Sequence, residues 1–180
     1  MIRPLQTMLV AVLFIAAAPQ DPSDIHRALR KEVTVAAPAE EVWKAWTTEE
    51  GLKTFFAPGA KVELTVGGAY EIYFLPSNPP GKRGADDCNV LAFEPMKRLA
   101  VTWNAPPQFP NVRKLRTRVV LEFEPVSARE TRVKFTQDGW GWGQEWDATY
   151  AYFDKAWDGV LGNLKKRFAE GPIDWSQASR

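Results

Sequence analysis

The stretch Asp147–Phe168, DATYAYFDKAWDGVLGNLKKRF, decides the fold of this chain. Its large apolar side chains recur three and four residues apart, which is the period of one face of an α-helix. They form a stripe made of Tyr150, Phe153, Trp157, Val160, Leu161, Leu164 and Phe168. A helix of this length is roughly 33 Å long at 1.5 Å per residue, so the stripe needs an equally long apolar surface to cover it.

A series of short strands supplies that surface. From Lys61 onward apolar residues alternate with polar ones, as in strands that bury one face. Gly67-Gly68 suits a tight hairpin between the first two of these strands. The pattern predicts strands at 61–66, 70–74, 88–93, 99–103, 117–123 and 131–136, preceded by one at 31–36. We expect consecutive strands to pair as an antiparallel meander.

Two short helices are expected between the first strand and this meander. Pro38 suits a first helical turn, and Val42 and Trp46 follow at helical spacing. Thr48 is a suitable N-cap for a second helix that carries Leu52. The order of elements therefore predicts an α+β fold in which a curved antiparallel sheet wraps around the long C-terminal helix.

The amino terminus has the pattern of a secretory signal peptide. Arg3 precedes an apolar run that ends in Ala16-Ala17-Ala18. The run of about 14 residues is shorter than the roughly 20 that a membrane span needs, although an uncleaved anchor is the main alternative. We expect a signal peptide at 1–18, a linker at 19–30, one domain at 31–172 and a C-terminal tail at 173–180. The protein would then be exported to the periplasm or the extracellular space.

Composition and charge exclude several classes of function. Of the residues, 45% are hydrophobic and 25% charged, which is typical of a globular domain. The net charge is only +1 and the basic residues are interleaved with acidic ones, which argues against a nucleic-acid or anionic-membrane partner. Cys88 is the only cysteine, so no intramolecular disulfide can form, and its apolar surroundings predict a buried, inert thiol.

The residues offer little catalytic or metal-binding chemistry. His26 is the only histidine and precedes the first strand, which excludes a histidine base within the domain and ordinary histidine-rich metal sites. No glycine-rich phosphate loop follows a strand. We therefore expect no metal and no cofactor.

Acid–base chemistry would need carboxylates or tyrosines. One group of carboxylates falls on the outer face of the strands, where we expect solvation: Glu63, Glu71, Glu122 and Glu124. A second group lies on the loops, where the simplest interpretation is surface charge, although a paired acid and base could form there: Asp86, Asp87, Asp138, Glu145 and Asp147.

The connections between strands point to one end of the sheet as the mouth of a binding site. In an antiparallel meander the tight links gather at one end and the long links, 57–60, 76–87, 104–115 and 137–146, at the other. Binding residues concentrate on such loops. This end is rich in aromatic residues, which either cap the core or contact a ligand: Phe56, Trp103, Phe109, Trp140, Trp142 and Trp146.

Strand parity and loop position together predict one apolar ligand site and no catalytic residue. The predicted ligand-binding residues come from the concave face of the sheet, the facing side of the helix and the mouth: Phe56, Tyr70, Ile72, Phe74, Val90, Trp103, Phe109, Phe135, Trp140, Tyr150, Phe153 and Trp157.

Several segments carry a family resemblance. They are VAAPAEEVW at 35–43, TEEGL at 48–52, FFAP at 55–58, VGGAY at 66–70, RLAVTW at 98–103, TQDGW at 136–140 and WDGVLGNL at 157–164. Together they resemble the activator of heat-shock ATPase homologue (AHSA1-like) branch of the START-like (SRPBCC) superfamily. The resemblance implies a helix-grip fold with a cavity for lipids, sterols, polyketides or other apolar molecules. It implies no single reaction, because this fold hosts many functions.

Three functions remain open on the sequence. The first is an exported, noncatalytic protein that binds a small apolar molecule. The second is a cofactor-free cyclase, dehydratase or hydrolase that uses mouth carboxylates and tyrosines. The third is a protein-interaction module, such as a chaperone regulator, that uses the aromatic rim.

Export is tested by the intact mass of the protein recovered from the periplasm or medium of its host. We expect loss of roughly the first 17 to 20 residues. A full-length species found only in the cytosol would contradict the predicted signal peptide.

Overall fold

The structure is a computed structural model that describes residues 27–177. The predicted signal peptide, most of the predicted linker and His26 lie outside the described residues. The elements are β1 (Leu29–Val35), α1 (Ala39–Thr47), α2 (Glu49–Lys53), β2 (Gly59–Val62), β3 (Tyr70–Tyr73), β4 (Gly84–Ala85), β5 (Val90–Glu94), β6 (Arg98–Trp103), α3 (Pro110–Arg113), β7 (Thr117–Ser127), β8 (Glu130–Asp138), α4 (Gln144–Glu170) and a 3₁₀ turn (Trp175–Gln177).

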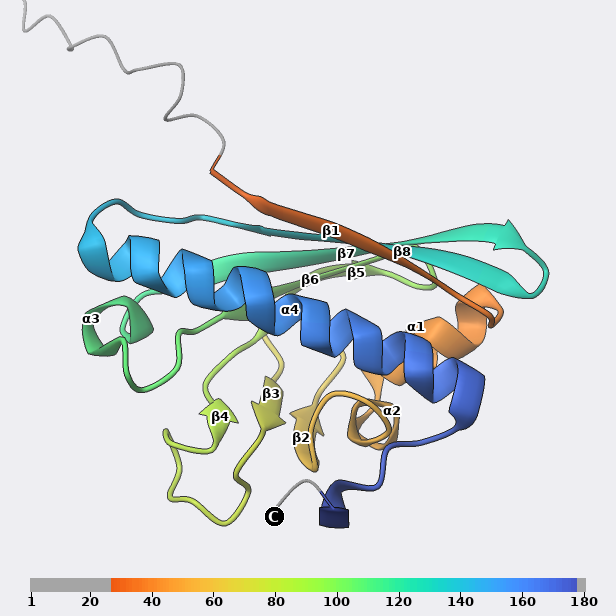
Figure 1. The fold of residues 1–180 in the computed structure, drawn as a ribbon, viewed down its shortest axis with the longest axis horizontal. Coiled ribbons are helices and arrows are strands. Elements are labelled where there is room, and N and C mark those ends of the chain that lie inside the picture. Colours follow the sequence, from red (N-terminus) through yellow and green to blue (C-terminus); the bar gives the residue numbers. More distant parts are fainter. Residues whose placement is uncertain (1–26, 178–180) are drawn as a thin grey trace, which may run out of the picture.

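A five-stranded antiparallel sheet, in the order β1-β8-β7-β6-β5, forms the main layer, and α4 runs along it (Figure 1). The first strand forms one edge of the sheet and pairs with β8 over its whole length. This is the predicted α+β helix-grip fold. None of the helices within residues 27–177 is long and apolar enough to cross a membrane.

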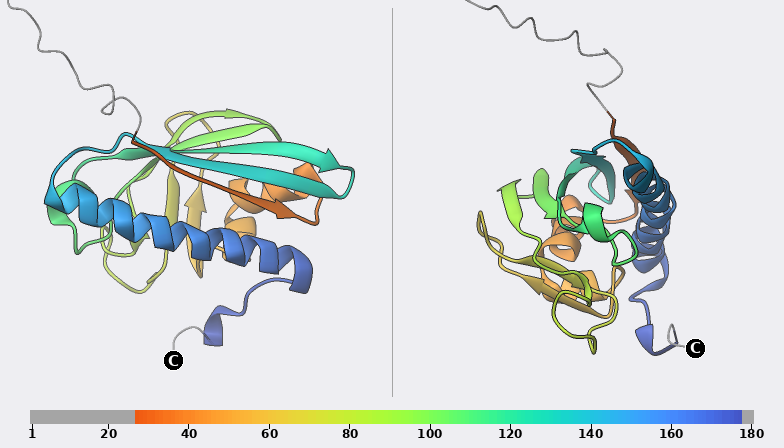
Figure 2. Two further views of the ribbon diagram at one scale, coloured as in Figure 1. Left: turned by 45° about the horizontal axis from the view of Figure 1, so that its top comes forward. Right: turned by 90° about the vertical axis from the view of Figure 1, so that its left-hand side faces the viewer.

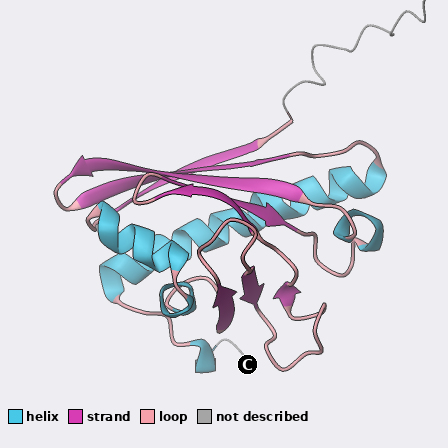
Figure 3. Ribbon diagram, turned by 180° about the vertical axis from the view of Figure 1, so that it is seen from behind, coloured by secondary structure: helices cyan, strands magenta, loops and turns pink. Residues whose placement is uncertain are grey.

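The meander differs from the prediction because it bends into a second sheet. β2, β3 and β4 form a separate three-stranded sheet, which faces α4 across the space beneath the main sheet (Figure 2, right). Backbone hydrogen bonds still join the two sheets, since Gly67 N donates to Val90 O at 2.8 Å and Tyr70 N donates to Cys88 O at 2.8 Å. The short helices α1 and α2 lie at one end of the molecule and α3 lies at the other (Figure 3).

Several strand ends differ from the prediction, and two strands, β2 and β3, end earlier than predicted. β2 ends at Val62, and Val66 is 72% exposed rather than buried. The cause is a turn that ends at Gly68, where Gly68 N donates to Thr65 O and Gly67 adopts a left-handed φ of 84°. β3 likewise ends at Tyr73, before the exposed Phe74.

The predicted helix is confirmed and extends over Gln144–Glu170. Its buried face carries Phe153, Trp157, Leu161 and Leu164, and the rest of the predicted stripe is half-buried. The predicted short helices are also confirmed, and Thr48 caps α2 by accepting a hydrogen bond from Gly51 N. Two short elements, β4 and α3, were not predicted.

One polar side chain links the sheet to α4 inside the core. Gln137 on β8 is fully buried, and its Oε1 accepts a 2.7 Å hydrogen bond from Trp157 Nε1. Its Nε2 donates to Thr117 Oγ1 at 2.9 Å, and Thr117 donates in turn to Trp103 O at 3.2 Å. These linked hydrogen bonds pair the buried side-chain atoms of Gln137, Thr117 and Trp157, so they fix the position of Trp157 against the sheet.

The Gln137 link gives a test of helix packing. Gln137→Leu keeps the volume roughly constant but leaves Trp157 Nε1 without its acceptor, so we expect a loss of about 1 to 3 kcal/mol in the free energy of unfolding. Denaturant unfolding measures this, with the exposed Gln108→Leu as a control that should change little.

A double-mutant cycle makes the test specific. In a Trp157→Phe background no indole N–H remains to be left unpaired, so Gln137→Leu should cost less there. An equal cost in both backgrounds would contradict the proposed link.

Candidate functional site

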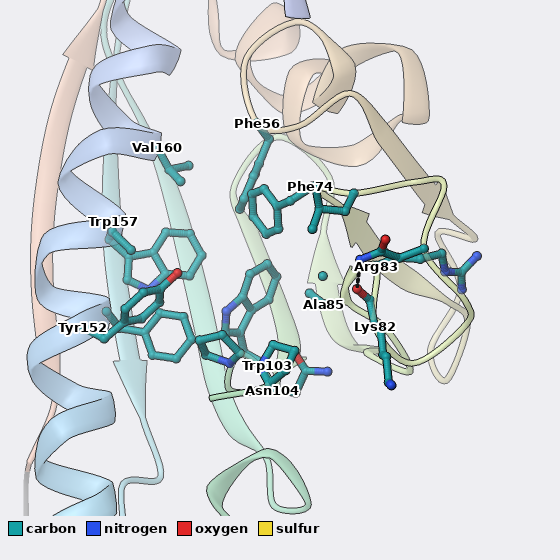
Figure 4. Close-up of a pocket in the computed structure, with 17 residues that line it drawn as sticks. Phe56, Phe74, Lys82, Arg83, Ala85, Trp103, Asn104, Tyr152, Trp157 and Val160 are labelled. Atoms are coloured by element: carbon teal, nitrogen blue, oxygen red, sulfur yellow. Dashed lines mark hydrogen bonds between the residues drawn. The ribbon is translucent and has the colours of Figure 1, made fainter. Parts of the chain in front are cut away.

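A cavity of about 390 Å³ lies between α4, the end of β6 and the loop that joins β3 to β4 (Figure 4). It is at the lower end of the size range of small-molecule sites. Aromatic and aliphatic side chains make up most of its wall. The lining residues are Phe56, Phe74, Leu75, Asn78, Lys82, Arg83, Gly84, Ala85, Trp103, Asn104, Pro106, Pro107, Tyr152, Phe153, Ala156, Trp157 and Val160.

The inner wall is a cluster of packed rings. Trp103 lies 5.1 Å from Trp157 and 5.8 Å from Phe56, measured between ring centroids. Phe56 also contacts Phe74 at 6.0 Å, which connects the core to the rim. Such ring pairs pack in tilted and edge-on geometries that stabilise the wall beyond simple burial. The cavity therefore has an aromatic inner wall.

Residues spaced four apart on α4 form one wall of the cavity. Tyr152, Ala156 and Val160 are four residues apart, and they line the cavity next to Phe153 and Trp157. Residues four apart lie one above the other on a helix. Ala156 is the smallest member of this row, so its position controls how much space remains in front of α4.

The opposite rim is held by a buried carboxylate. Asp86 is 1% exposed, and it accepts hydrogen bonds from the backbone N–H groups of Gly81, Arg83 and Gly84 and from Arg83 Nε. Burial acts to raise the pKa of Asp86, but the hydrogen bonds from Arg83 and from the backbone outweigh it and hold the pKa below its ordinary value. The expectation that Asp86 is surface charge was wrong.

Arg113 ties α3 to the same rim. Its Nη2 donates to Gly81 O at 2.7 Å and Gly84 O at 3.1 Å, and it lies 3.6 Å from Asp86 Oδ2. The loop after β6 and the loop between β3 and β4 are therefore joined by one guanidinium. This geometry fixes the width of the cavity mouth.

Arg83 points away from the cavity although its backbone lines it (Figure 4). Its guanidinium stacks 3.9 Å from the centre of the Tyr73 ring and lies 3.5 Å from Glu71. Burial, followed by the hydrogen bond to Glu71, raises the pKa of Tyr73 to about 12. The Glu71 side chain is only 13% exposed, so the expectation that it is solvated was wrong.

Of the other mouth carboxylates, Asp87 is exposed and the remaining three have structural partners. Asp138 pairs with Arg118 at 2.6 Å, Asp147 pairs with Arg27 at 2.6 Å, and Glu145 accepts from the backbone of α3. No lining residue carries a carboxylate or an imidazole. Within residues 27–177, no group of three or more His, Cys, Asp or Glu residues is arranged to hold a metal.

Five of the predicted ligand-binding residues line the cavity: Phe56, Phe74, Trp103, Phe153 and Trp157. Four others lie in the core: Tyr70, Ile72, Val90 and Phe135. Tyr70 donates a hydrogen bond to Trp46 O, and the Phe135 ring centroid lies 4.3 Å from that of Trp157.

Three predicted residues lie along α4 beyond the lining. Trp140 donates to Gln137 O, Tyr150 donates to Ala28 O, and Phe109 packs against the Tyr152 ring at 5.9 Å. Sequence reasoning missed Tyr152, Ala156 and Asn104. The four-residue spacing along the helix could have indicated Tyr152 and Ala156, and the predicted loop at 104–115 includes Asn104.

The fold and the cavity define a class of protein, the helix-grip domain with an internal apolar pocket. Within that class, residues 36–169 match the family described as Activator of Hsp90 ATPase homolog 1-like protein. The chain belongs to this family, as its sequence motifs predicted. No curated protein matches the chain at a significant level.

Solved structures share the fold. The protein MLL2253 from Mesorhizobium loti is 24% identical with a TM-score of 0.64, over 82% of this chain and 100% of that one. The Aha1 dimer from Colwellia psychrerythraea is 20% identical with a TM-score of 0.62, over 81% and 98%. CalU16 from Micromonospora echinospora is 18% identical with a TM-score of 0.58, over 84% and 79%.

The buried carboxylate gives a pH-dependent test of the rim. Because its folded pKa is lowered, Asp86 adds stability above its unfolded pKa, and this is lost as the pH falls through the folded value. We expect Asp86→Asn to lower the free energy of unfolding by about 1 to 3 kcal/mol at pH 7. The difference in the free energy of unfolding between wild type and Asp86→Asn should narrow below about pH 4.

Denaturant unfolding across this pH range measures this difference. The exposed neighbour Asp87→Asn is the matched control and should differ little from wild type. A gap between wild type and Asp86→Asn that widens in acid would show that the buried carboxylate does not hold the rim.

Proposed function

We propose that this protein binds a small apolar molecule, lipid-like or polyketide-like, in the cavity between sheet and α4, without catalysing a reaction. The observation that carries the proposal is the cavity of about 390 Å³ with its aromatic wall. Sites of this kind gain affinity from apolar area, at roughly 25 cal/mol per Å² removed from water. We also propose that it acts after export, on the strength of the amino-terminal sequence pattern.

The electrostatics of the mouth support binding over catalysis. General acid–base chemistry needs a titratable group within hydrogen-bond reach of the reacting atoms. The buried carboxylate nearest the cavity, Asp86, is engaged by Arg83 and three backbone N–H groups. Its lowered pKa also makes it a weak proton acceptor at neutral pH. The charges around this cavity hold its shape.

Filling the cavity tests the proposal. Ala156 faces the cavity and Ala151 lies exposed on the same helix, so Ala156→Phe and Ala151→Phe add the same atoms inside and outside the site. We expect Ala156→Phe to weaken binding of the neutral fluorescent probe N-phenyl-1-naphthylamine at least about tenfold, since the new ring occupies the space that the probe needs.

The control variant should bind the probe as wild type does. Circular dichroism of both variants checks that the fold is kept. Equal binding by folded Ala156→Phe and wild type would contradict the cavity as the site. The exposed rim around Phe74, Leu75 and Tyr152 would then be tested as a protein-interaction surface.

A further inference from the structure

We propose that the ligand carries a hydroxyl group, which accepts a hydrogen bond from Trp103 Nε1 and donates one to Asn104 Oδ1. The inference rests on the proposed function and names the chemistry that the cavity would select. It identifies the ligand as a hydroxylated apolar molecule, a phenol or alcohol, rather than a pure hydrocarbon.

The donor comes from the end of β6. Trp103 is 4% exposed and lines the cavity, and its Nε1 has no hydrogen-bond acceptor among the described residues. Trp140 and Trp157, by contrast, each donate to an oxygen of Gln137. Within residues 27–177, Trp46 Nε1 is the only side-chain polar atom that is both fully enclosed and unpartnered. The Trp103 N–H therefore remains accessible, and the cavity is the space that its side chain borders.

The acceptor is the next residue along the chain. Asn104 is 5% exposed, lines the cavity beside Trp103, and donates from Nδ2 to Asp86 O at 2.7 Å (Figure 4). A backbone carbonyl only accepts, so this bond fixes which end of the amide is nitrogen. The remaining arm of the side chain is Oδ1, which has no donor among the described residues and is not enclosed.

These two atoms together favour a hydroxyl group. A hydroxyl both donates and accepts, so one oxygen can satisfy the indole N–H and the amide oxygen. A carboxylate only accepts and would meet Asn104 Oδ1 without a proton to donate, and an ammonium group could not accept from Trp103. Polar atoms in an apolar wall discriminate strongly, because a ligand without the matching group leaves them unpaired.

Matched probes on one ring system test this. Calorimetric titration compares naphthalene, which has no polar group, with 2-naphthol, which has the hydroxyl. We expect wild type to bind 2-naphthol about tenfold or more tightly than naphthalene, since each added hydrogen bond contributes roughly 2- to 12-fold.

Three variants locate the preference. Trp103→Phe keeps an aromatic ring but removes the N–H, and Asn104→Leu removes the amide oxygen at similar volume. Each should cut the preference for 2-naphthol severalfold while naphthalene affinity changes less. Trp140→Phe removes a buried indole N–H outside the lining and should leave the preference unchanged.

The outcomes separate this inference from the proposed function. Binding of both probes with equal affinity in wild type, or a preference that survives in folded Trp103→Phe and Asn104→Leu, would overturn the hydroxyl inference alone. Failure of wild type to bind either probe, together with N-phenyl-1-naphthylamine, would overturn the cavity as the site. Should one variant fail to fold, the other still decides the inference.

Discussion

The hydrogen bond between Trp157 Nε1 and Gln137 Oε1 is the constraint on which the site depends. At the edge of the sheet, Lys31 on β1 also pairs with Asp154 and Asp158 of α4, both at 2.8 Å. In the core the other contacts between α4 and the sheet are apolar, and these specify position less sharply than a directional bond. The bond fixes the Trp157 indole against β8, and Trp157 in turn packs against Trp103 and Phe56. The aromatic wall of the cavity is thus set by a polar group in the core.

The cavity has an apolar interior, and charged residues behind its rim form a frame that consists of Asp86, Arg83 and Arg113. Asp86, Arg83 and Arg113 hold the rim loops from behind, and the Arg83 guanidinium faces Tyr73 rather than the cavity. Buried charges of this kind are tolerated because each has several hydrogen-bond partners. The frame can therefore hold two loops in place while the interior stays suited to apolar molecules.

The fold could be predicted from sequence because its signals are periodic. The stripe on α4 and the alternation on β8 depend only on residue spacing, and the family motifs agreed with them. The bend that separates β2–β4 depends on a turn and on pairing between distant strands, which spacing does not encode. Helical spacing likewise found Trp157 and Phe153. Strand parity, however, could not tell a cavity wall from filled core, as at Ile72 and Val90.

The most direct measurement is native mass spectrometry after incubation with an organic extract of the protein's own host. We expect wild type to take up a small molecule at a one-to-one ratio, denaturation to release it, and folded Ala156→Phe to take up none. Recovery of no molecule by wild type, or the same molecule at the same occupancy on Ala156→Phe, would contradict a ligand held between sheet and helix.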